Sequence, residues 1–150
     1  MSTIKEQLYI LCVTYVKNKE IEMKKAIAEA QEAANEETKS SAGDKFETGR
    51  EVMQQEIDLN LIRLNELDKM RQTLEKILPS QKSSSVAPGS VVRTNNGNYY
   101  ISISAGQLKV DGLTYYAISA ASPIGSKLAG CKAGDQFEMN GKKFVIEGVI

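Results

Sequence analysis

Two acidic residues, Asp44 and Glu47, have the side-chain type and the spacing needed to bind a cation. Residues three apart in the first turn of a helix lie on one side, and carboxylate oxygens are the hard ligands that Mg²⁺ prefers. Two carboxylates alone hold Mg²⁺ weakly, because the ion keeps most of its water, so this pair would act by completing a site that another molecule supplies. The structural alternative is that Asp44 caps a helix and Glu47 is its capping partner, both complementing the helix dipole.

Two long helical patterns flank this acidic pair. The first covers residues 3–37 without Pro or Gly, and Thr3 or Ser2 can cap its first turn with Glu6 at capping-box distance. The second covers residues 44–78, where Pro79 ends it. Both carry apolar residues at alternating spacings of three and four, which is typical of helices that pack together. We therefore predict an antiparallel coiled-coil hairpin over residues 1–78, with an acidic tip at residues 35–48.

The apolar faces of the two patterns differ. Small side chains gather toward the end of the first pattern, at Ala26, Ala28, Ala30, Ala33 and Ala34. Because small side chains let two helix backbones approach closely, we expect a slim hairpin near its tip. The apolar face of the second helix is wider than a two-stranded seam needs, which suggests a further contact with the C-terminal domain or with another subunit. Weak self-association through this face, and with it a role as a structural adaptor, therefore stays open.

Residues 79–90 have the composition of a linker, with two prolines and five serines. Beyond them the apolar period changes from helical to two, and strand patterns flank three turn signals. These signals are Asn95-Asn96-Gly97, Asp111-Gly112 and Asn140-Gly141. The stretch from Ser122 to Gly130 predicts one short helix, capped by Ser122 and with Pro123 at its first position. The expected fold class is α+β, with a small, mostly antiparallel β domain over residues 91–150.

Adjacent tyrosines occur twice in this domain, at residues 99–100 and 115–116. Their rings could stack on nucleic-acid bases. In alternating strands, however, one ring of each pair should point inward and one outward, which favours a structural role.

The composition excludes several kinds of active site. The chain has 19 basic and 19 acidic residues and no histidine, so a serine triad and a histidine-ligated metal are ruled out. Cys12 and Cys131 are too far apart in sequence to suggest a metal or redox motif. The charged N-terminal residues do not fit a secretory signal, and no stretch is long and apolar enough for a membrane span, so we expect a cytoplasmic protein without membrane contact.

Three segments together resemble one protein family. Residues 26–30 are similar to the first-arm segment of that family, and Gly43-Asp44-Lys45-Phe46-Glu47 fits its tip pattern Gly-Asp-x-x-Glu. The stretch Ser122 to Gly130, followed by Gly134-Asp135, resembles its C-terminal motif. The family is that of the bacterial Gre transcript-cleavage factors, which have an N-terminal antiparallel coiled coil and a C-terminal FKBP-like domain.

The resemblance implies a transcription elongation factor whose partner is RNA polymerase. The C-terminal domain would dock at the rim of the secondary channel, with Ser122, Pro123, Ile124 and Gly125 as docking residues. Asp44 and Glu47 would reach the catalytic centre and act as catalytic and metal-binding residues. There they would hold an Mg²⁺ ion shared with the polymerase while backtracked RNA is cut. The protein would contact nascent RNA only indirectly, would bind no cofactor when isolated and would not be an independent enzyme.

The tip departs from the family pattern in three ways. Residues 35–42 lengthen it, Lys45 stands where an apolar residue is common, and Thr48-Gly49-Arg50-Glu51 replaces the usual Asn-Ala-Glu-Tyr. A non-cleaving regulator that occupies the secondary channel, as DksA-like and anti-cleavage coiled-coil proteins do, is therefore the alternative. A prolyl isomerase or chaperone is suggested only by the FKBP-like fold.

Overall fold

The computed structural model describes residues 3–39 and 44–150, and within these ranges the side chains of residues 37–48 are not described. The fold is α+β, as predicted: two long helices precede a six-stranded, mostly antiparallel sheet with one short helix. The chain divides into two compact units. A helical unit covers Val16–Arg71, and a sheet unit combines Met1–Tyr15 with Gln72–Ile150.

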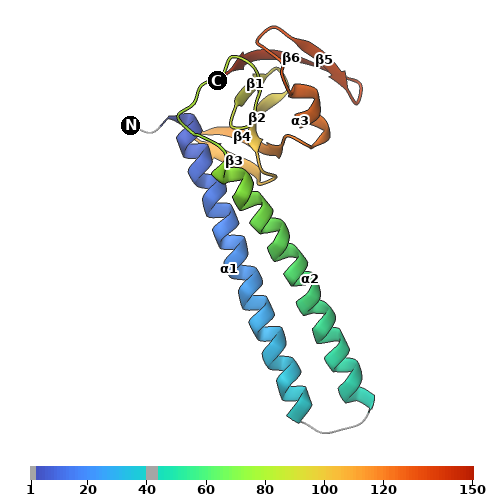
Figure 1. Ribbon diagram of the computed structural model, residues 1–150. Helices are drawn as coiled ribbons and strands as arrows, with labels where there is room; N and C mark the ends of the chain where they lie inside the picture. The colour runs from blue at the N-terminus through green and yellow to red at the C-terminus, as the bar shows by residue number, and fades with distance from the viewer. Residues whose placement is uncertain (1–2, 40–43) are drawn as a thin grey trace. The chain divides into compact units, whose positions relative to one another are not determined.

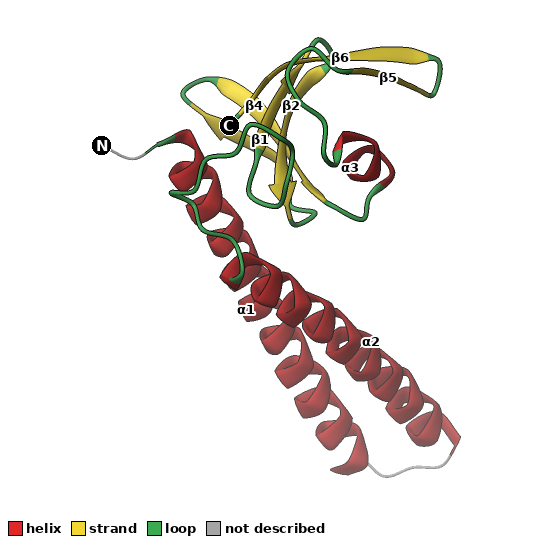
Figure 2. Cartoon of the chain, turned by 45° about the horizontal axis from the view of Figure 1, so that its top comes forward, coloured by secondary structure: helices red, strands yellow, loops and turns green. Residues whose placement is uncertain are grey.

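Helices α1 (Ile4–Lys39) and α2 (Asp44–Glu75) run antiparallel and side by side (Figures 1 and 2). At about 1.5 Å per residue, each is roughly 50 Å long. The predicted capping box at the start of α1 is confirmed: the Glu6 backbone N–H donates to Thr3 Oγ1 at 3.2 Å, and the Thr3 N–H donates to Glu6 Oε2 at 3.4 Å. No described helix has a segment apolar enough to cross a membrane.

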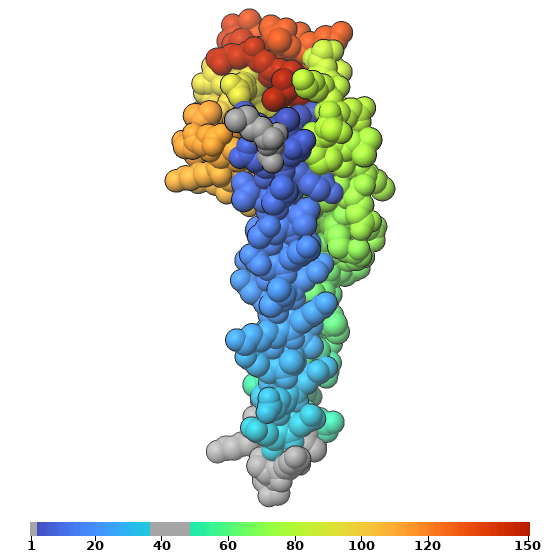
Figure 3. All heavy atoms as spheres, turned by 90° about the vertical axis from the view of Figure 1, so that its left-hand side faces the viewer, coloured from blue at the N-terminus to red at the C-terminus, as the bar shows by residue number. Residues whose placement is uncertain are grey.

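A narrow apolar seam joins the two helices of the helical unit. Figure 3 views the pair from the side of α1, with α2 behind it. Val16 and Ala30 of α1 are buried, and so are Ile57 and Leu67 of α2. Further partly buried residues continue the repeat of about seven in each helix: Met23, Ile27, Ala34, Met53 and Leu64. This is the spacing of helices that pack along one face.

The sheet has the strand order β3-β4-β2-β1-β6-β5. Its strands are β1 (Val91–Thr94), β2 (Gly97–Ser102), β3 (Gly106–Val110), β4 (Leu113–Ser119), β5 (Gln136–Met139) and β6 (Lys142–Val149). All three predicted turns connect antiparallel neighbours. In two of them the residue before glycine also adopts a positive φ, 51° at Asp111 and 54° at Asn140, which is the backbone of a tight hairpin turn. The pairing of β2 with β4 is parallel and was not predicted.

Both faces of the sheet are covered. On one face, helix α3 (Pro123–Leu128) lies over a core of Val86, Val92, Tyr99, Ile101, Leu128, Phe144 and Ile146. On the other, Cys12 of α1 lies against Ser102, with Sγ and Oγ 3.5 Å apart. Tyr100 and Tyr115 are fully buried and Tyr99 is 9% exposed, so the prediction that one ring of the 99–100 pair points to solvent is wrong. The reason is that helices cover both sides of this strand.

The wide apolar face of α2 divides along its length. Leu74 and the following Ile77 are buried in the sheet unit, and the Tyr9 hydroxyl donates to the Leu74 carbonyl at 3.0 Å. Nearer the start of α2, the apolar side chains are about half exposed: Val52, Leu59, Leu61 and Ile62. The end of the apolar face at Leu74 and Ile77 is therefore part of the core of the sheet unit, which is one of the two contacts that the sequence predicted.

Candidate functional site

The acidic pair lies at the beginning of α2. Asp44 is the first residue of this helix and Glu47 follows in its first turn, although both side chains are outside the described part of the chain. No group of three or more His, Cys, Asp or Glu side chains that could hold a metal occurs where side chains are described.

A polar cleft of about 330 Å³ opens between the helices, about two to four turns into α2. It is lined by Gln31, Ala34, Asn35, Arg50, Gln54 and Ile57. Ala34, one of the small side chains near the end of α1, lines this cleft, and Ala30, one turn earlier, is buried. The long polar side chains of Gln31, Arg50 and Gln54 line this cleft, and an open cleft lets water hydrate them.

The segment Ser122 to Gly125 forms the first turn of α3. Ser122 is the N-cap: its Oγ accepts from the Gly125 N–H at 3.1 Å and donates to the Ser119 carbonyl at 2.7 Å. Pro123 follows at the first helical position and is exposed. Gly125 is buried so closely against the preceding loop that a Cβ there would lie 2.2 Å from the Ser119 carbonyl oxygen. Three of the four predicted docking residues therefore build the helix turn itself.

The fourth residue, Ile124, lines a pocket of about 430 Å³ between α3 and the sheet. Aromatic and aliphatic side chains from several strands form its walls: Tyr99, Tyr116, Ile118, Met139 and Phe144. Its polar lining residues are Asn96, Asn140 and Lys142. An apolar floor with a few polar groups at the edge is the composition of a binding site for an apolar side chain or small ligand.

The pocket walls are held in place by specific contacts. Tyr99 and Tyr116 pack at a ring-centroid distance of 5.8 Å, and Phe137 stacks behind Phe144 at 4.9 Å. The β1–β2 turn is tied to β6, because Asn96 Nδ2 donates to the Lys143 carbonyl at 2.9 Å. Such a wall does not need to be ordered when a partner binds, which reduces the entropy cost of binding.

The electrostatics of the pocket are simple. Burial, followed by the neighbouring Tyr116, raises the pKa of Tyr99, so its hydroxyl stays neutral at physiological pH and donates to the Asn96 carbonyl at 3.4 Å. Lys142 is the only charged side chain among the described lining residues.

Sequence reasoning identified Ile124 but missed the rest of the pocket. Tyr116 was considered as a stacking residue, and Met139 and Lys142 flank the predicted Asn140-Gly141 turn, so partial signals existed. What the sequence did not show is that the parallel β2–β4 pairing brings Tyr99 beside Tyr116. In comparisons with known proteins, no family model and no curated protein matches the chain.

Proposed function

We propose that the protein binds RNA polymerase through its secondary channel and stimulates cleavage of backtracked RNA. In this proposal α1 and α2 form a coiled-coil hairpin that reaches into the channel, and the sheet unit is an FKBP-like docking domain. The observation that carries the proposal is that two antiparallel helices of about 50 Å are joined where the acidic pair begins α2. A small globular fold does not need helices of this length for its own stability, whereas a long pair of helices is narrow enough to enter a channel.

The tip would contribute ligands and no complete active site. Asp44 and Glu47 would add carboxylate oxygens to an Mg²⁺ ion held mainly by the polymerase. An ion in such a place activates water and stabilises charge on the phosphate under attack. The start of a helix would suit this role, because residues three apart lie on one side of a helix and the backbone N–H groups of a first turn favour negative charge.

The docking site in this proposal is the pocket beside α3. An apolar side chain of the polymerase would enter between Tyr116 and Ile124, and Lys142 would pair with an acidic group at the edge. Ser122, Pro123 and Gly125 would act by holding Ile124 in place through the α3 turn. The pocket and the tip would then have separate tasks, affinity and chemistry.

The proposed role of the pocket in docking can be tested by measuring binding to bacterial core RNA polymerase. Tyr116→Ala removes an exposed pocket wall and should weaken binding about tenfold or more, since tyrosines at the centre of interfaces often contribute over about 1.4 kcal/mol. Leu113→Ala is the control, because this residue is similarly exposed on the same strand but does not line the pocket. Equal affinities of the wild type and Tyr116→Ala would refute docking through the pocket.

A second candidate function is favoured by the tip sequence. Lys45 and the segment Thr48-Gly49-Arg50-Glu51 differ from the cleavage-factor pattern, and a protein with such a tip could occupy the channel without cutting RNA. The two functions differ in one measurable respect. A cleavage factor needs Asp44 and Glu47 for transcript shortening, whereas a channel-occupying regulator alters initiation or pausing without shortening the transcript.

A further inference from the structure

Lys142 is a charged residue on a face of β6 that is otherwise apolar. Side chains alternate between the two faces of a sheet, so Lys142 shares its face with Phe144 and Ile146, both of which are buried. Across the β5–β6 hairpin its neighbour is Met139, which lines the pocket beside α3 as Lys142 does. The register of the hairpin therefore places a lysine at the edge of an apolar pocket.

The next lysine along the strand has a different environment. Lys143 is paired across the hairpin with Glu138, and alternation puts these two residues on the face opposite Met139. Opposite charges at directly paired positions attract each other. Both lysines are exposed, but only Lys142 lines the pocket and only Lys143 has an acidic cross-strand neighbour.

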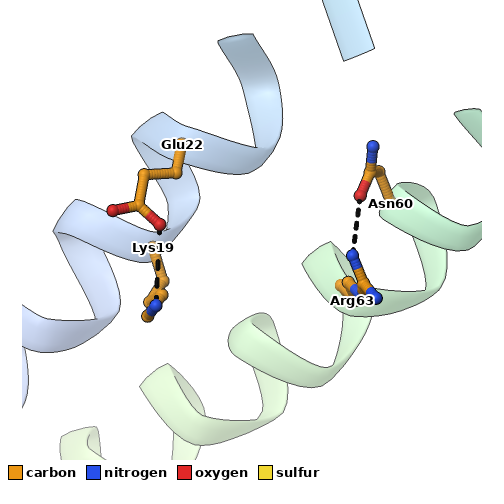
Figure 4. Close-up of polar contacts among 4 residues, drawn as sticks. All are labelled: Lys19, Glu22, Asn60 and Arg63. Carbon is orange, nitrogen blue, oxygen red and sulfur yellow. Dashed lines mark hydrogen bonds and ion pairs between the residues drawn. The ribbon is translucent and has the colours of Figure 1, made fainter. Parts of the chain in front are cut away.

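Lys142 also lacks the local partners that other cations of the chain have. On the helices, Lys19 pairs with Glu22 at 3.6 Å, and Arg63 Nη1 donates to Asn60 Oδ1 at 3.3 Å (Figure 4). Among the described residues, no acidic side chain forms an ion pair with Lys142, and none of those that line the pocket is acidic. The positive charge at the pocket edge is therefore available to an anionic group of a ligand.

The size and the walls of the pocket indicate the rest of the ligand. Its volume of about 430 Å³ lies in the range of small-molecule sites, about 300–1,000 Å³. Tyr99 and Phe144 are buried and Tyr116 is 37% exposed, so aromatic surface extends from the floor of the pocket to its edge. Aromatic side chains pack well against a flat apolar group.

We propose that this pocket binds a small carboxylic acid with an aromatic body. The body would lie between Tyr116 and Ile124, and the carboxylate would pair with Lys142. Burial of the apolar body would provide most of the affinity, whereas the ion pair, which is partly open to water, would favour the acid over a neutral analogue. If polymerase docks through the same pocket, the acid would compete with it, and this consequence alone rests on the proposed function.

The test compares phenylacetate with phenylacetamide, a neutral analogue of nearly the same shape. Each compound is titrated into the isotope-labelled full-length protein, and the backbone amide signals in nuclear magnetic resonance spectra report which residues respond. Phenylacetate should shift the signals of pocket residues such as Ile118 and Met139, with a roughly millimolar Kd for a ligand of this size. Phenylacetamide should bind about fivefold more weakly, because it cannot form the ion pair.

Two matched variants assign the charge to one lysine. Lys142→Met should weaken phenylacetate binding about fivefold and leave phenylacetamide binding unchanged, whereas Lys143→Met, the same change on the other face of β6, should alter neither. If Lys142→Met does not fold, Lys142→Gln should give the same result. Equal phenylacetate affinities of the wild type and the Lys142 variant would overturn the proposal, as would unshifted pocket signals at about 20 mM phenylacetate.

A competition experiment separates this proposal from docking to polymerase. Binding to core RNA polymerase is measured with and without phenylacetate, and the acid should weaken binding of the wild type more than that of Lys142→Met. If phenylacetate shifts the pocket signals but leaves polymerase affinity unchanged, docking through the pocket is refuted and the acid site stands. The titrations contain no polymerase, so their result does not depend on the proposed function.

Discussion

Replacing Gly125 with alanine tests how the first turn of α3 is held against the sheet. An ideal Cβ at this position would lie 2.2 Å from the Ser119 carbonyl oxygen, and real Cβ contacts are essentially never closer than 3.0 Å. The same Cβ would lie 2.8 Å from Ser122 Oγ, which is the N-cap of the helix. Because the closest atom belongs to the backbone, no rotation of a side chain relieves the clash, and α3 must move.

The size of the effect follows from two opposing contributions. Alanine is favoured over glycine inside a helix by about 1 kcal/mol. Forcing the helix away from the Ser119 carbonyl costs about 3 kcal/mol or more, the upper range for overpacking. Gly125→Ala should therefore lose roughly 2 kcal/mol of unfolding free energy and about 6 °C of thermal midpoint. Because the shift also moves Ile124, binding to polymerase should weaken.

Urea unfolding followed by circular dichroism measures the change, with Gly148→Ala as the matched control. Gly148 lies in β6, and no atom lies within 4 Å of a Cβ built there. This control should stay within about 0.5 kcal/mol of the wild type. If Gly125→Ala were as stable as the wild type or more so, helix propensity would dominate and the close approach argued here would be refuted.

Two further predictions concern the buried face beneath α1. The Tyr100 hydroxyl is buried without a hydrogen-bond partner among the described residues, so Tyr100→Phe should leave the unfolding free energy unchanged or raise it by up to about 1 kcal/mol. By contrast, Tyr9→Phe loses the bond to the Leu74 carbonyl and should cost about 1 kcal/mol in urea unfolding; the opposite order would contradict the assignment. Burial is the main cause that raises the pKa of Cys12 and of Tyr100, so the folded state keeps these protons to higher pH than the unfolded state does. The stability that these two protonated groups give the folded state is therefore complete below pH 9.0, the ordinary pKa of a thiol, and is lost as the pH rises above it. The urea midpoint should therefore fall as the pH rises from about 9 to about 10.5, and it should fall less steeply in Cys12→Ala. Lys5 gives an opposing trend, because burial, and then the charge of Lys82, lower its pKa. A midpoint that does not fall over this range would contradict the assignment.

The local parts of the fold follow from local sequence signals. The Thr3–Glu6 capping box, the Asn-Gly and Asp-Gly turns and the Ser122-Pro123 helix start each depend on a few adjacent residues, and the structure confirms all of them. A cap or a tight turn is specified by backbone geometry that only certain side chains support, so neighbours in sequence are sufficient to predict it.

The pocket could not be predicted in the same way. Tyr99 and Tyr116 are brought together by the parallel β2–β4 pairing, which joins strands that are not consecutive in the chain. The same limit explains the error for Tyr99, since its burial depends on α3, which begins 24 residues later in the chain at Pro123. The burial of Asn60 could not be predicted either, because an isolated asparagine in a helical pattern is ordinarily read as a surface residue.

The central claim is that the start of α2 carries carboxylates that help the polymerase cut RNA. The most direct measurement adds the wild type, or the Asp44→Ala/Glu47→Ala variant, to a halted, backtracked elongation complex with labelled RNA at several Mg²⁺ concentrations. We expect the wild type to shorten the transcript and the double variant to bind the complex without shortening it. If the wild type also co-migrates with the polymerase but leaves the RNA uncut at every Mg²⁺ concentration, the cleavage function is contradicted and the two acids are caps of α2.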